Sequence, residues 1–460
     1  MTHPLSNSQM RDAEALLHPY ANAVALRETG VQMIARGEGI RVYDETGKSF
    51  IEGLSGLWCA GLGFDNAELV ETAREQMARL PYYHLFTGKS HDKAVELAEK
   101  IKDLAPGRIA RVFYQSSGSE ANETQIKMAW YYNNALGRRE KKKIISRVKA
   151  YHGTTIVSAS LTGLPYNHID FDLPVDRIKH TSTPHFWKGA EEGETEAEFS
   201  ARLARDFEEM ILAEGPDTVA AFIAEPIMGA GGVIVPPKGY FPAMAEVARK
   251  YDVLMISDEV ICGFGRTGQW FGAQTLGYEA TSYSMAKQLT GSFAPLSAVG
   301  INQDMAEVIE KHSGQIGTFG HGYTYGGHPV ACAVGIKTLE IYQRIDAPGR
   351  VRALAPRFAG HLDRLAGHPL VGEARHTGLV GALELAPGKS PKGFATPGKV
   401  GPRLALELLE RGVIVRAVAD SIAFCPPMII TEEEIDELFA PVEAALDATE
   451  AWARKEGHLG

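Results

Sequence analysis

Apolar and polar residues follow two alternating patterns through the middle of the chain. Short runs rich in apolar and β-branched residues predict strands at Ala110–Tyr114, Lys143–Val148, Val219–Ala224, Val253–Ser257, Ser282–Ala286 and Leu296–Ile301. Between them, helices are predicted from Ser119 to about Leu136, over Tyr240–Lys250 and from near Pro329 onward. Strands that alternate with helices are typical of an α/β layered domain with a largely parallel sheet.

The pattern changes in the last third of the chain. It predicts a helix over Lys399–Arg411, a strand over Val413–Arg416, a short strand over Ser421–Cys425, and a capping box of Thr431 and Glu434 before a final amphipathic helix. This α+β end indicates a separate, smaller domain. A hairpin is expected around Asp44–Gly47, and the pattern leaves open which domain the N-terminal segment joins.

Composition and charge narrow the class of protein. The chain has 460 residues, 45% hydrophobic and 23% charged, which suits two or three globular domains. A net charge of -10 argues against nucleic acid or an anionic membrane as partner, and the basic run at 138–143 is interpreted as a solvated loop. The four cysteines lie far apart, and no window indicates an export signal or a membrane span. We therefore expect a cytoplasmic protein without a metal site or a disulfide framework.

Two charged residues end consecutive predicted strands. Asp258 follows one apolar run and Lys287 ends the next, 29 residues later. Open α/β sheets bind ligands at the carboxyl edge of their strands. Taken singly, the acid is interpreted as a turn residue and the lysine as a surface residue. Together they are the pair that pyridoxal 5′-phosphate requires, an acid that keeps the ring nitrogen protonated and a lysine that holds the aldehyde as a Schiff base.

A phosphate group needs its own site, and the stretch 115–122 is a candidate. It is small and polar where a long helix is predicted to begin. Gly118 allows the backbone to approach closely, while the hydroxyls of Ser117 and Ser119 and the free helix N–H groups can bind a dianion. A simple serine N-cap is compatible with the same residues. Tyr151, followed by His152 at another strand end, could stack on a planar cofactor, although a tyrosine there is more often ordinary packing.

A glycine-rich segment at 263–268, GFGRTG, matches the GxGxxG pattern of dinucleotide-binding proteins. That pattern should lead directly from a strand into a helix. Here Asp258 to Cys262 separate the glycines from the strand, bulky Arg266 lies inside the motif, and the following residues favour no helix. We therefore predict no dinucleotide site.

The segments SGSEAN, YHG, AEPI, SDEV, GFGRTG, Lys287 and YTYGGHPV stand in one order over more than 200 residues. Together they resemble the class III aminotransferases, from roughly residue 35 to the last helix. The resemblance implies a homodimer of fold type I, with a large α/β domain around a mostly parallel seven-stranded sheet and a small α+β domain from both chain ends. We expect residues 60–328 to form the large domain that binds the cofactor, and residues 1–59 and 329–460 the small one.

The resemblance also assigns roles to single residues. Lys287 would form the Schiff base and then move the proton between Cα of the substrate and C4′ of the cofactor, and Asp258 would hold the pyridinium nitrogen. The other implied cofactor contacts are the phosphate site of Ser117, Gly118 and Ser119, the ring between Val260 and Tyr151, Thr324 from the neighbouring subunit, and His152 and Glu225 nearby.

The resemblance also indicates which substrates the enzyme would use. Glutarate-using members carry an acid and an arginine where this chain has Ala230 and Ala423, and losing both together leaves no uncompensated buried charge. Arg416 aligns with the movable arginine of amine–pyruvate (ω-) aminotransferases, which suits a pyruvate or alanine carboxylate. A surface arginine at a strand end is the alternative. The amine pocket would be lined by Trp58, Phe86, Tyr151 and Ala230, with Trp58 also explicable as a core residue.

The resulting hypothesis is a transaminase that moves the amino group of a primary amine to pyruvate, giving an aldehyde or ketone and alanine in a ping-pong cycle. The alternatives are an aminomutase, racemase or decarboxylase on the same fold, an aminotransferase that uses 2-oxoglutarate, and a non-catalytic binding protein. The sequence leaves the donor open among aryl-alkylamines, diamines, taurine and β-alanine, and does not distinguish a dimer from a tetramer.

Overall fold

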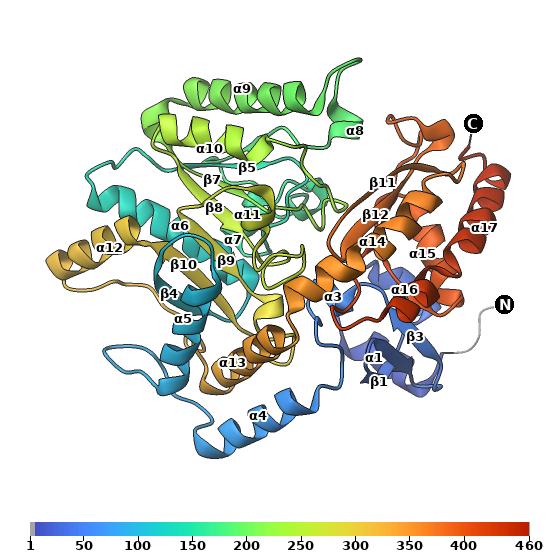
Figure 1. Cartoon of the computed structure of the whole chain (residues 1–460), viewed down its shortest axis with the longest axis horizontal. Helices are drawn as coiled ribbons and strands as arrows, with labels where there is room; N and C mark the ends of the chain where they lie inside the picture. Colours follow the sequence, from blue (N-terminus) through green and yellow to red (C-terminus); the bar gives the residue numbers. More distant parts are fainter. Residues whose placement is uncertain (1–4, 460) are drawn as a thin grey trace.

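A seven-stranded sheet lies at the centre of the larger part of the molecule, as the computed structural model of residues 5–459 shows (Figure 1). In spatial order its strands are β4 (Ile109–Gln115), β10 (Ser297–Asn302), β9 (Ser282–Met285), β8 (Leu254–Asp258), β7 (Val219–Ala224), β5 (Lys143–Arg147) and β6 (Ile178–Thr181). The pairings from β9 to β6 are parallel, and β10 is antiparallel to both neighbours. The largely parallel sheet is confirmed, and β6 is an addition because its sequence, IKHT, has no apolar run.

Helices cover both faces of this sheet. Ala221 of β7 clusters with Ile126 of α6 (Gly118–Ala135). The next residue, Phe222, lies on the opposite face and clusters with Phe207 of α9 (Glu196–Glu214) and Phe241 of α10 (Tyr240–Lys250). A strand buried on both faces has no polar position, which explains the sequence VAAFIA of β7.

Shorter or more peripheral helices complete the larger part. They are α4 (Ala67–Arg79), α5 (Asp92–Leu104), α7 (Ile156–Leu161), η1 (Pro165–Asn167), α8 (Phe186–Gly189), η2 (Pro216–Thr218), α11 (Gly272–Leu276), η3 (Lys287–Leu289), α12 (Gln303–Ile316) and α13 (Pro329–Arg344). Among the described residues, no helix combines the length and the apolar character needed to cross a membrane.

The two chain ends lie together beside the larger part (Figure 1). The N-terminal segment contributes α1 (Asn7–Ala15), α2 (Ala23–Thr29), β1 (Ile34–Glu38), β2 (Arg41–Asp44), β3 (Ser49–Glu52) and α3 (Ser55–Trp58). The C-terminal segment contributes α14 (Ala347–Leu365), β11 (Val371–Thr377), β12 (Val380–Leu385), η4 (Pro387–Lys389), α15 (Val400–Glu410), β13 (Val413–Ile414), β14 (Arg416–Val418), β15 (Ser421–Phe424), α16 (Glu432–Phe439) and α17 (Val442–Lys455). They form two four-stranded sheets, β1-β2-β3-β13 and β11-β12-β15-β14. Because β13 pairs with β3, the small α+β part is built from both ends, as predicted.

The predicted strand Val413–Arg416 is wrong in one respect. The structure divides it into β13, which pairs in parallel with β3, and β14, which pairs with β15 in the other small sheet. Val415 is the one residue between them, so Arg416 begins a strand where the sequence pattern predicts that it ends one. Both halves are apolar, and hydrophobicity does not show that the chain changes partners.

The predicted final helix is also two helices. α16 ends at Phe439 and α17 begins at Val442, with Pro441 as its N-cap. Proline fits the start of a helix because the first N–H groups have no intrahelical partner. The capping box of Thr431 and Glu434 at the start of α16 is confirmed.

Candidate active site

Asp258 and Lys287 lie at the carboxyl ends of adjacent parallel strands. Asp258 is the last residue of β8, and Lys287 follows β9 by two residues. The strands pair directly, with Asp258 opposite Ser284. Lys287 has a φ of 49°, in the left-handed region that non-glycine residues rarely adopt. Such strain is typical of positions that the surrounding fold holds for function.

The Asp258 carboxylate is buried and held by three donors. One oxygen, Oδ2, accepts from Nδ2 of Asn122 at 2.6 Å and from Nδ1 of His152 at 2.7 Å. The other oxygen, Oδ1, accepts the backbone N–H of Val260 at 3.1 Å. Since the carboxylate is an acceptor, His152 donates from Nδ1, and its Nε2 is buried without a partner among the described residues. These contacts fix one orientation of the acid.

Lys287 is mostly enclosed by protein. Burial lowers the pKa of its amine, while the neighbouring Cys59 and Asp258 act in the opposite direction. Within residues 5–459 it makes no ion pair. A lowered pKa raises the fraction of neutral amine, which is the form that attacks an aldehyde.

The start of α6 forms a cradle of small residues beside these two groups. Ser117 is its N-cap and completes a capping box with Glu120. A Cβ placed on Gly118 would lie 3.0 Å from Cγ1 of Val260, so the helix start touches the residue two positions after Asp258. Ser119 Oγ accepts the N–H of Thr154 at 3.1 Å. The N-terminus of a helix binds anions through its free N–H groups and its dipole.

The side chains at this edge therefore fit pyridoxal phosphate. The cradle at Gly118 suits a phosphate, Asp258 suits a protonated ring nitrogen, and Lys287 suits the aldehyde. The main observation behind this fit is the close packing at Gly118, where the side chain of a larger residue would meet Val260.

Glu225 holds the backbone that carries Tyr151. Its Oε1 accepts the N–H of Tyr151 at 3.0 Å, and its Oε2 accepts the N–H of Gly229 at 3.1 Å. Burial raises the pKa of Glu225. Burial and the hydroxyl of Tyr20 likewise raise the pKa of Tyr151. Glu225 thus positions the loop of Tyr151, and both of its oxygens are already engaged.

Trp58 is buried at the end of a distorted turn. Its φ is 66°, and Gly56 and Leu57 of α3 have non-helical backbone angles. The turn is held by Glu52, whose Oε2 accepts the N–H groups of Leu54 and Gly56. On the other side, Nε2 of Gln288 donates to the Trp58 carbonyl at 3.4 Å, which links Trp58 to the residue after Lys287.

Arg416 lies opposite Ala423 in the β14–β15 pairing. Ala423 is fully buried, and Ala230 is buried as well. Arg416 lines a cleft of about 1030 Å³ together with Tyr20 and Tyr166, and its charge acts on the hydroxyl of Tyr151. No ion pair of Arg416 occurs in the described part of the chain. Its guanidinium is therefore available to a ligand carboxylate.

Phe86 and Thr324 lie on the surface. Phe86 is 43% exposed, and its ring would lie 2.7 Å from a Cβ placed on Gly322. The Thr324 carbonyl accepts the hydroxyl of Tyr82 at 2.9 Å, and the Thr324 side chain faces solvent. Within residues 5–459, no hydrogen bond or ion pair joins either residue to Lys287 of the same chain.

Sequence reasoning missed two residues at the site. Asn122, which donates to Asp258, lies four residues after Gly118, one helical turn along the same face of α6. That spacing was the signal that could have found it. Gln288 contacts Trp58 and also accepts the hydroxyl of Tyr342 at 2.7 Å. No local pattern marks it, because its partners are distant in the sequence.

Known proteins resemble this chain over nearly its whole length. The family model for class III aminotransferases matches residues 24–446. A mitochondrial gamma-aminobutyrate transaminase 1 from Oryza sativa subsp. japonica is 45% identical over 437 residues, covering 95% of this chain and 85% of the rice protein. A crystal structure of the omega transaminase from Pseudomonas jessenii in complex with PMP has a TM-score of 0.96 and 48% identity, covering 97% of this chain and 99% of that one.

A second solved structure, described as a transaminase with L-alanine, is 48% identical with a TM-score of 0.89, covering 91% of this chain and 99% of that one. The TM-scores show that the fold of this chain is that of these transaminases. The chain belongs to the class III aminotransferases, fold-type-I enzymes that depend on pyridoxal phosphate.

Proposed function

We propose that this aminotransferase moves the amino group of a primary amine to pyruvate, producing a carbonyl compound and alanine in a ping-pong cycle. The observation that carries this proposal is Arg416, a guanidinium beside Tyr151 that has no ion-pair partner among the described residues and faces the small side chain of Ala423. Pyruvate is a short molecule with a single carboxylate, and one arginine is enough to bind it. An apolar amine leaves the arginine in the solvated cleft.

The proposed roles at the reacting centre follow from the contacts. The bound cofactor supplies an electron sink for the bond at the substrate Cα. The neutral amine of Lys287 would take the proton from Cα of the substrate and deliver it to C4′ of the cofactor. Asp258, held by Asn122 and His152, would accept the hydrogen bond of the ring nitrogen. Tyr151 and Val260 would hold the two faces of the ring, and the start of α6 at Ser117–Ser119 would hold the phosphate.

The relatives support both a primary-amine donor and a pyruvate acceptor. The rice protein is named for gamma-aminobutyrate, which is itself a primary amine at the end of a chain. The Pseudomonas jessenii protein is described as an omega transaminase. The structure with L-alanine holds the amino acid that pyruvate becomes. Trp58 and Ala230 are proposed to line the amine pocket.

The proposal extends to the oligomeric state, the domain division and the location of the enzyme. Phe86 and Thr324 lie on one surface, which suits a homodimer in which they complete the site of the neighbouring subunit. We also propose a large domain of residues 60–328 and a small domain from the end segments 1–59 and 329–460, although α13, at the start of the last segment, packs against α4 and α5 of the large domain. The cytoplasm is the proposed location.

The deciding experiment compares pyruvate with 2-oxoglutarate as acceptor for one amine donor, in the parent enzyme and in Arg416→Ala. We expect pyruvate to be preferred. In the variant, kcat/KM for pyruvate should fall about 10–100-fold, because a charged hydrogen-bonded pair contributes about 1.5–3 kcal/mol. The donor half-reaction with an alkylamine, followed by cofactor absorbance, should change far less. A strong preference for 2-oxoglutarate would overturn the proposal.

A further inference from the structure

The cleft beside Arg416 carries more positive than negative side chains. Its walls come from the loop after β5, from the β14–β15 region and from the segment after η4. The cationic residues that line it are Lys149, Lys188, Lys392 and Arg416, and the acidic ones are Glu384 and Asp420. The excess of positive charge is local, because the whole chain has a net charge of -10.

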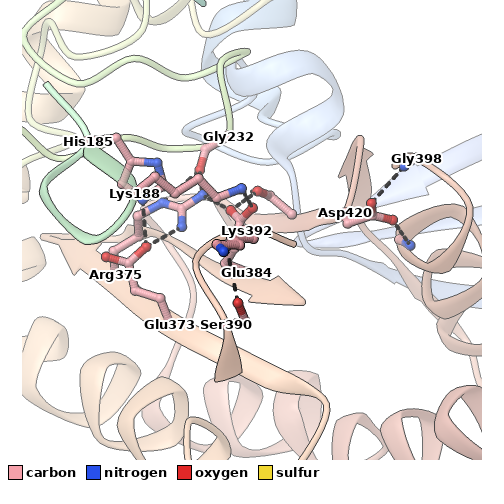
Figure 2. A network of polar contacts seen from close by, with 12 residues as sticks. His185, Lys188, Gly232, Glu373, Arg375, Glu384, Ser390, Lys392, Gly398 and Asp420 are labelled. Carbon is pink, nitrogen blue, oxygen red and sulfur yellow. Dashed lines mark hydrogen bonds and ion pairs between the residues drawn. The ribbon is translucent and has the colours of Figure 1, made fainter. Parts of the chain in front are cut away.

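Both acids of the cleft are already engaged (Figure 2). Glu384 pairs with Arg375 at 2.7 Å and with Lys188. Although burial opposes it, these two cations lower the pKa of Glu384 to about 2, so the carboxylate is charged and compensated. Asp420 accepts three backbone N–H groups, from Gly398 at 2.6 Å, Val400 at 3.0 Å and Gly401 at 2.9 Å.

Two lysines are left without an acid. Within the described residues, the amines of Lys149 and Lys392 make no ion pair or hydrogen bond, whereas Lys188 is bound to Glu384. Burial lowers the pKa of Lys149, and the charges of Lys188 and Arg375 act in the same direction against the attraction of Glu384. A half-buried cation with only cations as free neighbours is costly unless an anion completes the site.

The backbone holds Lys149 in place. Its φ is 67°, its N–H donates to the Gly163 carbonyl at 2.8 Å, and a Cβ on Gly231 would lie 2.5 Å from its carbonyl oxygen. Lys149 is two residues before Tyr151, and Gly231 directly follows Ala230. Lys149 therefore lines the cleft from a backbone segment that also carries Tyr151 and packs against Gly231.

We propose that Lys149 and Lys392 form an anion subsite beyond Arg416, which binds the carboxylate at the far end of a long amine donor. This inference rests on the proposed function and names its donor class, ω-amino acids whose chain extends past Arg416. Lysine suits the task because its ammonium is a point charge on a flexible stem, which reaches a carboxylate at the end of a mobile chain. Arg416 remains available to the acceptor carboxylate in the second half-reaction.

The test is a donor series measured with the better of pyruvate and 2-oxoglutarate as acceptor. ω-Amino acids of three to eight carbons are compared with alkylamines of matched length in the parent enzyme, Lys149→Gln, Lys392→Gln and Arg416→Ala. Lys149→Gln should lower kcat/KM for the long ω-amino acids about tenfold, with a smaller loss for Lys392→Gln. Lys149→Arg should restore most of the loss. The alkylamines should be affected at most twofold. Lys311→Gln, an exposed lysine outside the cleft, is the matched control.

A second measurement does not depend on turnover. Octanoate, which carries the carboxylate but no amine, is titrated calorimetrically into the holoenzyme, and its Kd should rise about tenfold in Lys149→Gln. Equal losses for ω-amino acids and alkylamines, or an unchanged octanoate Kd, would overturn the subsite. The acceptor comparison with Arg416→Ala fails or succeeds separately, so a wrong acceptor and a wrong subsite give different results.

Discussion

Lys287 lies in a strained, mostly buried backbone position and makes no ion pair within residues 5–459. Its φ is 49° and burial lowers the pKa of its amine. Replacing it with alanine removes both the group that binds the aldehyde and the group that moves the proton. Lys287→Ala should therefore lose the visible absorbance of the bound cofactor and at least about 10²–10⁴-fold in kcat. Spectra and single-turnover rates measure this, with Lys311→Ala as control. Substantial turnover in Lys287→Ala would remove Lys287 from the mechanism.

Some residues of the site can be predicted from the sequence, and others cannot. Asp258 and Lys287 could be predicted because each follows an apolar run, and the order of parallel strands brings such ends together. Asn122 was within reach through its helical spacing from Gly118. Gln288 was not, because its contacts with Trp58 and Tyr342 join segments far apart in the chain. Local patterns describe periodicity, whereas such contacts depend on the three-dimensional fold.

The start of α6 depends on the absence of a side chain at Gly118. A methyl group there would lie 3.0 and 3.2 Å from the two γ carbons of Val260, so Val260 has to shift. Gly118→Ala should weaken cofactor binding about tenfold, as a modest displacement of a packed contact costs about 1–2 kcal/mol. Titration of apoenzyme with pyridoxal phosphate measures the Kd. Gly314→Ala, in a helix with nothing near the added carbon, should leave that Kd unchanged.

The turn that carries Trp58 should respond to pH through Glu52. Burial raises the pKa of Glu52 from 4.5 to about 7, against the backbone hydrogen bonds of Gly56 and Leu54. The folded state then binds a proton that the unfolded state has released. Between the two pKa values the free energy of unfolding therefore falls as pH rises, and it levels off above the folded value.

Glu52→Gln should lack this slope. From pH 5 to pH 8 the parent enzyme should lose about 2–3 kcal/mol relative to the variant. Urea unfolding at both pH values measures the difference. Glu209→Gln, at an exposed position without an ion pair among the described residues, should follow the parent enzyme. A pH-independent difference between Glu52→Gln and the parent would mean that Glu52 is ionised throughout.

At the scale of the whole molecule, the surface position of Thr324 makes the proposed dimer testable. Lys287→Ala and Thr324→Asp should each have low activity as homodimers, the second because a carboxylate repels the cofactor phosphate. Co-expressed with different tags and purified as a hybrid, the two chains should regain activity. One site of the hybrid then has an intact Lys287 and an intact Thr324 from the other chain. A hybrid as inactive as its parents would place Thr324 in the site of its own chain.

The general architecture could be predicted, and the path of the C-terminal segment could not. Alternating strands and helices predict the large sheet, because a strand buried on both faces is apolar throughout. The edge strand β6 was missed because three of its four residues, in the sequence IKHT, are polar. The division of 413–418 between two sheets was missed because pairing partners, and not hydrophobicity, separate β13 from β14.

That division has a consequence for how the enzyme can be recombined with its relatives. Val415 alone separates β13, which pairs with the N-terminal sheet, from β14, which begins with Arg416. β3 of that sheet ends at Glu52, which holds the turn of Trp58. In a chimera that takes its first 59 residues from another family member, a different β3 would shift its partner β13 and therefore Arg416. The same exchange would replace the turn of Trp58. Donor range and acceptor range would be expected to change together in such hybrids, even where no exchanged residue touches the acceptor.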